Sequence, residues 1–299
     1  MNARLSSALS LLFSCLLCGW ALMLVATSPA QARGLNWFGC GNVLSLHAIA
    51  GSGRVVSQSR HLGDFDRIVV AGCVDAVVST RTAQSVSVQA DDNVADAVST
   101  TVKDRTLRID VRNGFRSRQS PKVIISMQSL KSVALEGSGD AQLSGLAENS
   151  LEASISGSGD LQASGSVGRL SVSSRGSGDI KLQDLASRDV SLDLGGSGDA
   201  HLRLSAGGRL YAVLSGSGDV SATGETERVA ATIGGSGDLF CAALHSRDAS
   251  IRVRGTGNAR LWASQSIAII IDGSGDVGYG GNPPHVTKKV SGSGEVSTF

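Results

Sequence analysis

Acidic side chains recur at an almost constant interval in the second half of this 299-residue chain. Each acid follows Gly-Ser-Gly or a near variant, and successive motifs begin 18 to 20 residues apart. If the chain stacks units of that length, the acids form one column. Carboxylates and turn carbonyls are ligands that Ca²⁺ prefers. The sequence therefore offers a candidate calcium column, made of Asp140, Asp160, Asp179, Asp199, Asp219, Asp238 and Asp276.

A structural role for these acids is the favoured interpretation. Adjacent carboxylates at the strand spacing of about 4.8 Å would repel by roughly 1 kcal/mol even in water. Each Asp can instead accept hydrogen bonds from nearby amides of its turn, with the glycines supplying positive φ. Asn258, which replaces one Asp, can make the same bond without charge, and Glu295 ends the column. We therefore expect the acids to brace turns and assign no metal ligand.

Catalytic motifs are sought and not found. The chain has no Gly-x-Ser-x-Gly elbow, no His-Glu-x-x-His and no phosphate-binding Walker loop. The glycine pattern at 273–278 precedes Pro283 and Pro284 and cannot open a nucleotide-binding helix. The five histidines are scattered: His47, His61, His201, His245 and His285. We expect no enzyme and no cofactor, although a polysaccharide-active enzyme built on paired aspartates stays an alternative.

The repeating unit predicts the elements that position the acids. After each Asp a short apolar/polar alternation leads to a glycine-rich turn, and a second alternation leads to the next motif. Such a unit reads as two strands and two turns with one apolar face. Stacking nine units of 19–20 residues buries that face in one interior. We predict an all-β parallel β-helix (β-solenoid), taken as right-handed, with an antiparallel meander as the alternative.

The chain before the repeats is less regular. Residues 61–121 have higher charge density and strand-like stretches, and Asp91 or Asp92 could cap a short helix between them. We read 61–121 as the irregular start of the solenoid, which caps its interior, and 122–299 as the regular repeats. Together they form one domain, 61–299. Residues 33–60 are predicted to be a flexible lead.

Residues 1–32 resemble an export signal. Arg4 precedes an apolar run, and Ala30 and Ala32 are the small residues that signal peptidase requires, so the mature chain would begin at Arg33. An uncleaved membrane anchor is the alternative. Of the remaining cysteines, Cys40 and Cys73 could form a disulfide, and Cys241 is expected to be a small buried hydrophobe.

The composition excludes some classes of protein. The chain has 38 glycines and only 4% aromatic residues, which favours thin repetitive β structure over a thick layered domain. Its 27 basic and 26 acidic side chains leave a net charge of +1. Nucleic-acid binders and polybasic membrane-surface proteins need an excess of positive charge. We therefore expect neither a nucleic-acid partner nor, once the signal is cleaved, a transmembrane domain.

The order of several motifs resembles one known family. The stretch 65–70, then 75–78, then 86–93 and 107–109, precedes the serial Ser-Gly-Ser-Gly-Asp motifs, and 281–294 looks like the usual ending. This order resembles the putative autotransporter adhesin, head GIN domain family over about 61–299. The resemblance implies an exported bacterial β-helical protein and offers no catalytic residues to carry over. Thr256, Asn258 and Glu295 depart mildly from the pattern.

The sequence thus predicts an exported, non-enzymatic β-solenoid of the periplasm, the outer-membrane surface or the extracellular space. Its expected role is binding or adhesion, with a glycan or a surface protein as the partner. The first alternative is a structural envelope protein that self-associates as a homo-oligomer through exposed coil ends. The second is the polysaccharide-active enzyme. Neither the ligand nor the oligomeric state follows from the sequence.

Overall fold

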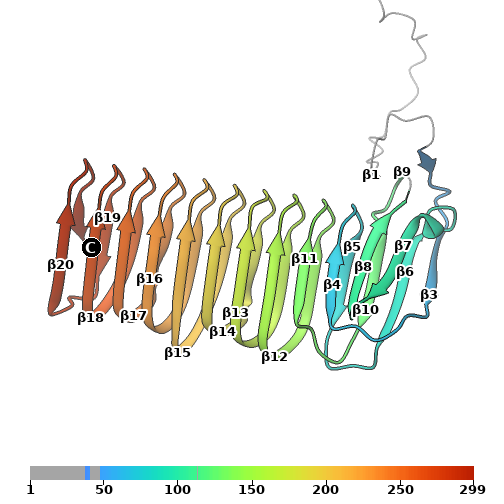
Figure 1. The fold of residues 1–299 in the computed structure, drawn as a ribbon, viewed down its shortest axis with the longest axis horizontal. Coiled ribbons are helices and arrows are strands. Elements are labelled where there is room, and N and C mark those ends of the chain that lie inside the picture. Colours follow the sequence, from blue (N-terminus) through green and yellow to red (C-terminus); the bar gives the residue numbers. More distant parts are fainter. Residues whose placement is uncertain (1–37, 41–47, 113) are drawn as a thin grey trace, which may run out of the picture. The chain divides into compact units, whose positions relative to one another are not determined.

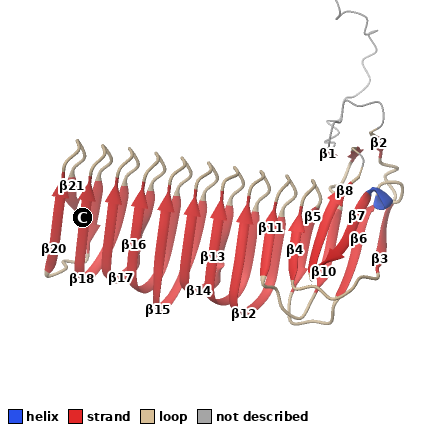
Figure 2. Ribbon diagram, viewed as in Figure 1, coloured by secondary structure: helices blue, strands red, loops and turns tan. Residues whose placement is uncertain are grey.

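The computed structural model describes residues 38–40, 48–112 and 114–299, which all belong to one unit of the chain, Trp37–Phe299. The predicted export signal and His47 lie outside these residues. The regular elements of the described chain are all strands apart from one short 3-10 helix (Figure 2). Within it, no helix has both the length and the apolar character needed to span a bilayer.

The regular part is a stack of parallel strands, as predicted (Figure 1). Each strand pairs in parallel with its equivalent one coil later, and the acid-bearing turns lie between successive strands. The strands are β11 (Ser132–Leu135), β12 (Ala141–Ile155), β13 (Leu161–Ser174), β14 (Ile180–Leu194), β15 (Ala200–Leu214), β16 (Val220–Ile233), β17 (Leu239–Val253), β18 (Ala259–Ile271), β19 (Val277–Gly280), β20 (His285–Val290) and β21 (Val296–Thr298).

Apolar residues alternate with polar ones and face one continuous core. In β13, for example, Leu170 and Val172 are buried while Ser171 between them is exposed. Leu170 is in register with Val190 of the next coil, and the same column continues through the stack. The fold class is therefore confirmed as a parallel β-solenoid, and the antiparallel meander is wrong for these coils. Its handedness stays a prediction.

Each long coil is one continuous strand, where the sequence suggested two strands separated by a turn. β12 to β18 run for 13 to 15 residues and bend around the core, with register shifts at the bend. Gly165, at such a bend, has a φ of +124°, which favours glycine. Neighbouring coils bend at the same place, so pairing resumes beyond the bend and the strand is not interrupted.

The glycines of the Gly-Ser-Gly motif have a different role from the one expected. The sequence predicts positive φ for them, but in the described chain none of the glycines in the motifs that precede the acid column has it. Instead, a Cβ at Gly157 would overlap the carbonyl oxygen of Gly137 in the preceding coil, and one at Gly178 would overlap that of Gly159. The glycines are required because the turns of successive coils stack backbone against backbone.

The N-terminal part mixes parallel and antiparallel pairing. β4 pairs in parallel with both β8 and β11, and β5 pairs in parallel with β10 and β12, while β3–β6, β6–β10 and β7–β8 are antiparallel. The elements are β1 (Phe38–Cys40), β2 (Ile49–Ala50), β3 (Val55–Arg60), β4 (Arg67–Val70), β5 (Asp75–Ser79), β6 (Ser85–Asp91), η1 (Ala95–Ala97), β7 (Val98–Lys103), β8 (Thr106–Val111), β9 (Phe115–Ser117) and β10 (Lys122–Ser126).

Two details of this region differ from the sequence interpretation. β3 lies within the predicted flexible lead and pairs with β6. The short helix exists as η1, but it has no side-chain cap. Asp91 accepts a hydrogen bond from the Ser117 hydroxyl (2.7 Å), and Asp92 from the Ser52 hydroxyl (2.5 Å). Neither acid is free to cap the helix, because each fixes a neighbouring segment.

Candidate functional site

The predicted acid column exists and is a hydrogen-bonded ladder. The side-chain oxygen at each position accepts a hydrogen bond from the backbone amide of the equivalent residue one coil later. From Asp140 to Glu295 these distances are 2.7–3.1 Å. Asp75, at the start of β5, extends the ladder by accepting from the Asp140 amide at 3.3 Å. The acids therefore link successive turns.

This geometry corrects the detail of the expected bracing. The sequence assigned each Asp to amides of its own turn, whereas the amide that it binds belongs to the next coil. Asn258 follows the same rule: its amide donates to Asp238 Oδ1 (2.7 Å), and its Oδ1 accepts from the Asp276 amide (2.9 Å). The contact therefore needs an oxygen and no charge. Across the described residues, no three or more His, Cys, Asp or Glu side chains are placed to hold a metal ion.

Lys181 offsets some of the negative charge on the ladder. Its Nζ lies 2.8 Å from Asp160 Oδ2 and 3.7 Å from Asp179 Oδ2. Burial opposes ionisation of Asp160, but hydrogen bonds from Lys181 and from the Asp179 amide outweigh it and lower the pKa of Asp160. The hydrogen bond to Asp160 correspondingly raises the pKa of Lys181. This ion pair reduces the repulsion between the stacked acids next to it.

A second charged feature, which the sequence analysis missed, is a hollow of about 380 Å³ over β13, β14, β15 and the middle of β16. Arg169, Arg188 and Arg209 line it together with Asp189 and Glu227. Arg169, Asp189 and Arg209 are in register on three successive strands. Aligning the repeats by the Gly-Ser-Gly-Asp motif that follows each strand would have shown Arg169, Asp189 and Arg209 at equivalent positions, with Arg188 beside them. This arginine hollow can accept negatively charged groups.

A third feature is a group of exposed or partly exposed aromatic side chains near the C-terminal coils, which we call the aromatic platform: Phe240, His245, Trp262 and Phe299, with Arg260 beside them. The rings of His245 and Trp262 are 4.5 Å apart. Phe240 is 43% exposed and Phe299 is 63% exposed. Phe299 packs over two glycines of β19, which leave room for its ring. In a chain so poor in aromatic residues, this concentration on one surface suits the faces of sugar rings.

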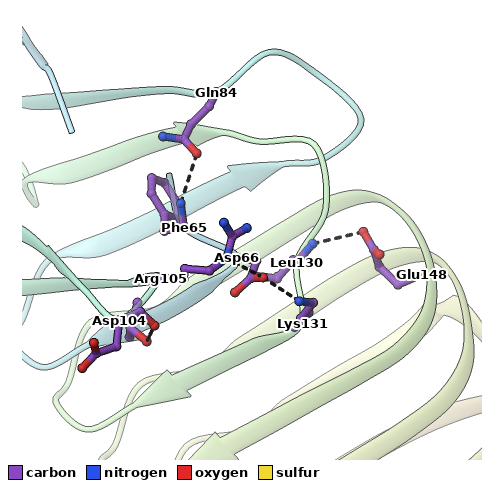
Figure 3. A network of polar contacts seen from close by, with 9 residues as sticks. Phe65, Asp66, Gln84, Asp104, Arg105, Leu130, Lys131 and Glu148 are labelled. Carbon is purple, nitrogen blue, oxygen red and sulfur yellow. Dashed lines mark hydrogen bonds and ion pairs between the residues drawn. The ribbon is translucent and has the colours of Figure 1, made fainter. Parts of the chain in front are cut away.

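The motif at 65–70 contains a buried carboxylate with a structural role (Figure 3). Asp66 Oδ2 accepts hydrogen bonds from Lys131 Nζ (2.7 Å) and Arg105 Nε (3.1 Å). Its backbone also bonds to both residues: the Asp66 amide donates to Arg105 O, and the Lys131 amide donates to Asp66 O. Asp66 thus joins β4, the β7–β8 turn and the first regular coil.

Two further side-chain contacts in Figure 3 fix the same region. Gln84 Oε1 accepts from the Phe65 amide at 3.3 Å, and Glu148 Oε1 accepts from the Leu130 amide at 3.1 Å. Each side chain satisfies a backbone donor just before β4 or β11, where no strand pairing is available to it. This network positions the cap against the solenoid.

The cysteines and histidines form no reactive cluster in the described residues. Cys241 is buried, as predicted, and burial raises the pKa of its thiol to about 12. Cys73 is disulfide-bonded, and its partner lies outside the described side chains, so the Cys40–Cys73 pair stays a prediction. Of the described histidines, His245 joins the aromatic platform, while His61, His201 and His285 are on separate strands or loops.

Comparison with known proteins gives a family and a set of similar folds. The family model described as "Putative auto-transporter adhesin, head GIN domain" matches residues 64–225 and 183–283. A search of curated proteins found no match.

Three solved structures share the fold. A "putative adhesin" from Parabacteroides distasonis has a TM-score of 0.61 and 19% identity, covering 84% of this chain and 100% of its own. A "putative adhesin" from Parabacteroides merdae has a TM-score of 0.59 and 18% identity, covering 85% of this chain and 99% of its own. A "putative lipid binding protein" from P. distasonis has a TM-score of 0.55 and 24% identity, covering 84% of this chain and 99% of its own. At these identities the similarity shows the fold alone.

Proposed function

Because the chain belongs to the putative auto-transporter adhesin, head GIN domain family, we propose that it is an exported, non-enzymatic binding module of the adhesion type. It acts in the cell envelope or at the cell surface, and its partner is a glycan. The aromatic platform and the polar columns on the outside of the coils supply the contacts.

The observation that carries this proposal is the register of the outward side chains. Positions such as Ser171, Ser191 and Tyr211 follow one another on adjacent strands, so polar and aromatic groups repeat at about 4.8 Å along the stack. A repeating surface of this kind suits a repeating polymer, because each additional contact acts at high effective concentration once the first has formed. Individually weak contacts then sum to useful affinity.

Binding by the mature chain, residues 33–299, tests the proposal on a glycan array and on whole cells. We expect binding to a defined subset of glycans. The comparison variant is the same chain with Phe240 and Trp262 changed to Ser. The Phe240 and Trp262 side chains are partly exposed, so their loss leaves the core intact. No binding above unrelated protein would refute the proposed function. A rise in reducing ends or in unsaturated products on incubation with acidic polysaccharides would favour the enzyme alternative instead.

Export has a test of its own. Expression of the full chain in a Gram-negative bacterium should yield a product that begins at Arg33 and fractionates outside the cytoplasm. Mass spectrometry of the purified protein reads the N-terminus directly. A product that retains residues 1–32 in the membrane fraction would support the anchor alternative.

Self-association is the second candidate function, and the exposed strand β20 favours it. All six residues of β20 are exposed, and Val286 and Val290 are 40% and 47% exposed although they continue columns of the core. Among the described strands β20 pairs only with β18, so one edge offers unpaired backbone groups.

The same strand carries a feature that opposes self-association. Lys288 continues the core column of Ile269, and its Nζ lies over the Tyr279 ring at 4.7 Å from the centroid. A charge placed at an inward position of an edge strand hinders addition of another strand. We therefore expect the wild-type protein to sediment as a monomer and Lys288→Val to associate. Concentration-dependent oligomers of the wild type would favour the structural role.

A further inference from the structure

The arginine hollow lies on the solvent-facing surface of four coils. It is formed by residues from the second half of each strand. Arg169 is on β13, Arg188 on β14 and Arg209 on β15. Gly207 lines the hollow and provides no side chain there. A Cβ at Gly207 would meet nothing within 4 Å, whereas one at Gly208 would overlap the Arg188 carbonyl oxygen.

The guanidinium groups of the hollow are not neutralised. Elsewhere, cations beside acids form close pairs, such as Arg252 with Asp272 at 2.5 Å and Lys181 with Asp160 at 2.8 Å. In the hollow, Asp189 is the register neighbour of both Arg169 and Arg209, yet within the described chain neither arginine comes within 4.0 Å of a carboxylate.

The remaining groups of the hollow leave it with excess positive charge. Arg188 uses its Nε to donate to the Gly207 carbonyl (3.2 Å), which holds the side chain in place and leaves its terminal nitrogens available. Arg228 follows Arg209 in register on β16, but it does not line the hollow, and its own register neighbour on β17 is Asp248. The residues that line the hollow thus include three arginines, Arg169, Arg188 and Arg209, against two carboxylates.

The spacing suits a linear polyanion. Arg169 and Arg209 are two strands apart, which at about 4.8 Å for each strand puts their backbones roughly 10 Å apart along the stack. Guanidinium groups bind carboxylate and sulfate through paired N–H donors. Ser191 lines the same hollow, and its hydroxyl can donate to or accept from a sugar hydroxyl.

We propose that the arginine hollow binds the acidic groups of a linear polysaccharide that carries carboxylates or sulfates. This inference rests on the proposed binding function and names its ligand class and its site. A polysaccharide fits better than a lipid surface because the hollow combines fixed cations with a hydroxyl, and the exposed aromatic platform lies on other coils. It fits better than nucleic acid because the chain as a whole is nearly neutral, with 27 basic and 26 acidic side chains.

The test measures binding of the mature chain to polygalacturonate, dextran sulfate and uncharged dextran at physiological salt. The variant is the double substitution Arg169→Gln and Arg209→Gln. The control is Arg175→Gln with Arg254→Gln, which removes the same charge from two exposed positions that precede the acid motif, outside the hollow. All four side chains are exposed, so both variants should keep the wild-type melting temperature.

We expect the wild type to bind the two polyanions and the hollow variant to bind them about tenfold or more weakly, with a smaller dependence on salt, while the control changes less than about twofold. Equal losses in both variants, or no binding of either polyanion by the wild type, would overturn the proposal. The proposal would also be overturned if the hollow variant lost more of its binding to vesicles of anionic phospholipid than of its binding to the polysaccharides. A hollow variant that keeps its glycan-array and cell binding refutes this site alone, whereas a wild type that binds no glycan at all refutes the proposed function.

Discussion

Replacing Gly196 by alanine should separate two coils that are otherwise in close contact. Gly196 lies in the turn between β14 and β15, and its φ is not in the positive region that favours glycine. An alanine backbone is therefore allowed there. Its Cβ, however, would overlap the carbonyl oxygen of Gly176 and lie 2.9 Å from the Gly176 carbonyl carbon, where ordinary contact begins at 3.4 Å. Because the obstacle is backbone, the turn must move.

The cost follows from the bonds that such a movement breaks. A shift of about 1 Å or more would lengthen three hydrogen bonds beyond their normal range: Gly195 N to Ser174 O (2.7 Å), Ser197 N to Gly176 O (3.0 Å) and Asp199 N to Asp179 Oδ1 (3.1 Å). At about 1 kcal/mol for each bond, we expect a loss of about 3 kcal/mol. For a domain of this size that corresponds to roughly 6–12 °C in melting temperature.

The neighbouring residue provides the matched control. A Cβ at Gly195 would approach no atom closer than 3.5 Å, and equivalent positions in other coils carry side chains such as Arg175 and Ser215. Gly195→Ala should be neutral or slightly stabilising, because it restricts the unfolded chain. Thermal and urea unfolding of both variants, followed by circular dichroism, measures the difference. If Gly196→Ala costs within about 1 kcal/mol of Gly195→Ala, the close-approach explanation of the motif is wrong.

Three other predictions concern titratable groups. Asp199→Asn should change the melting temperature by less than about 2 °C, because an amide oxygen accepts the same hydrogen bond as at Asn258. EDTA should leave the melting temperatures of the wild type and the variant unchanged. A fall in melting temperature with EDTA that is reversed by Ca²⁺ and absent in the variant would indicate metal binding. Asp66→Asn should lower stability by about 1–2 kcal/mol at pH 7. The hydrogen bond from Lys131 is the main cause that lowers the pKa of Asp66 below 3.8, so this stabilisation is present above that pH and is lost as pH falls through the lower folded value; a deficit that persists undiminished at pH 2 would contradict it. Cys241, whose pKa burial raises to about 12, should resist iodoacetamide at pH 8 until the protein unfolds, and mass spectrometry showing rapid labelling of the native protein would show that the thiol is accessible.

Much of the architecture could be read from the sequence because it is a consequence of local repetition. An alternation of period two decides which side chains face inward, as at Leu170 and Val172. A motif of nearly constant spacing decides that equivalent residues meet when units stack. These two periods were sufficient to predict parallel coils, a continuous apolar core and one column of acids. They also placed Cys241 in the core, because its neighbours in the repeat are apolar.

Only the tertiary structure decided which groups from different coils bond to one another. The acid ladder has the predicted members, but Asp160 accepts its hydrogen bond from the amide of Asp179 in the next coil (2.9 Å). The motif glycines are needed for contact between coils, which no single turn reveals. The arginine hollow also depends on register, since Arg169 and Arg209 are 40 residues apart in sequence.

The N-terminal cap was the least predictable part for the same physical reason. β4 lies between β8 and β11, and Asp66 meets Lys131 across 65 residues of sequence. No repeat constrains those pairings, so they arise from the packing of dissimilar strands around one end of the core. The sequence by itself determined the repeating coil and its inside and outside. The tertiary structure decided the contacts between coils, because these depend on register between segments that are distant along the chain.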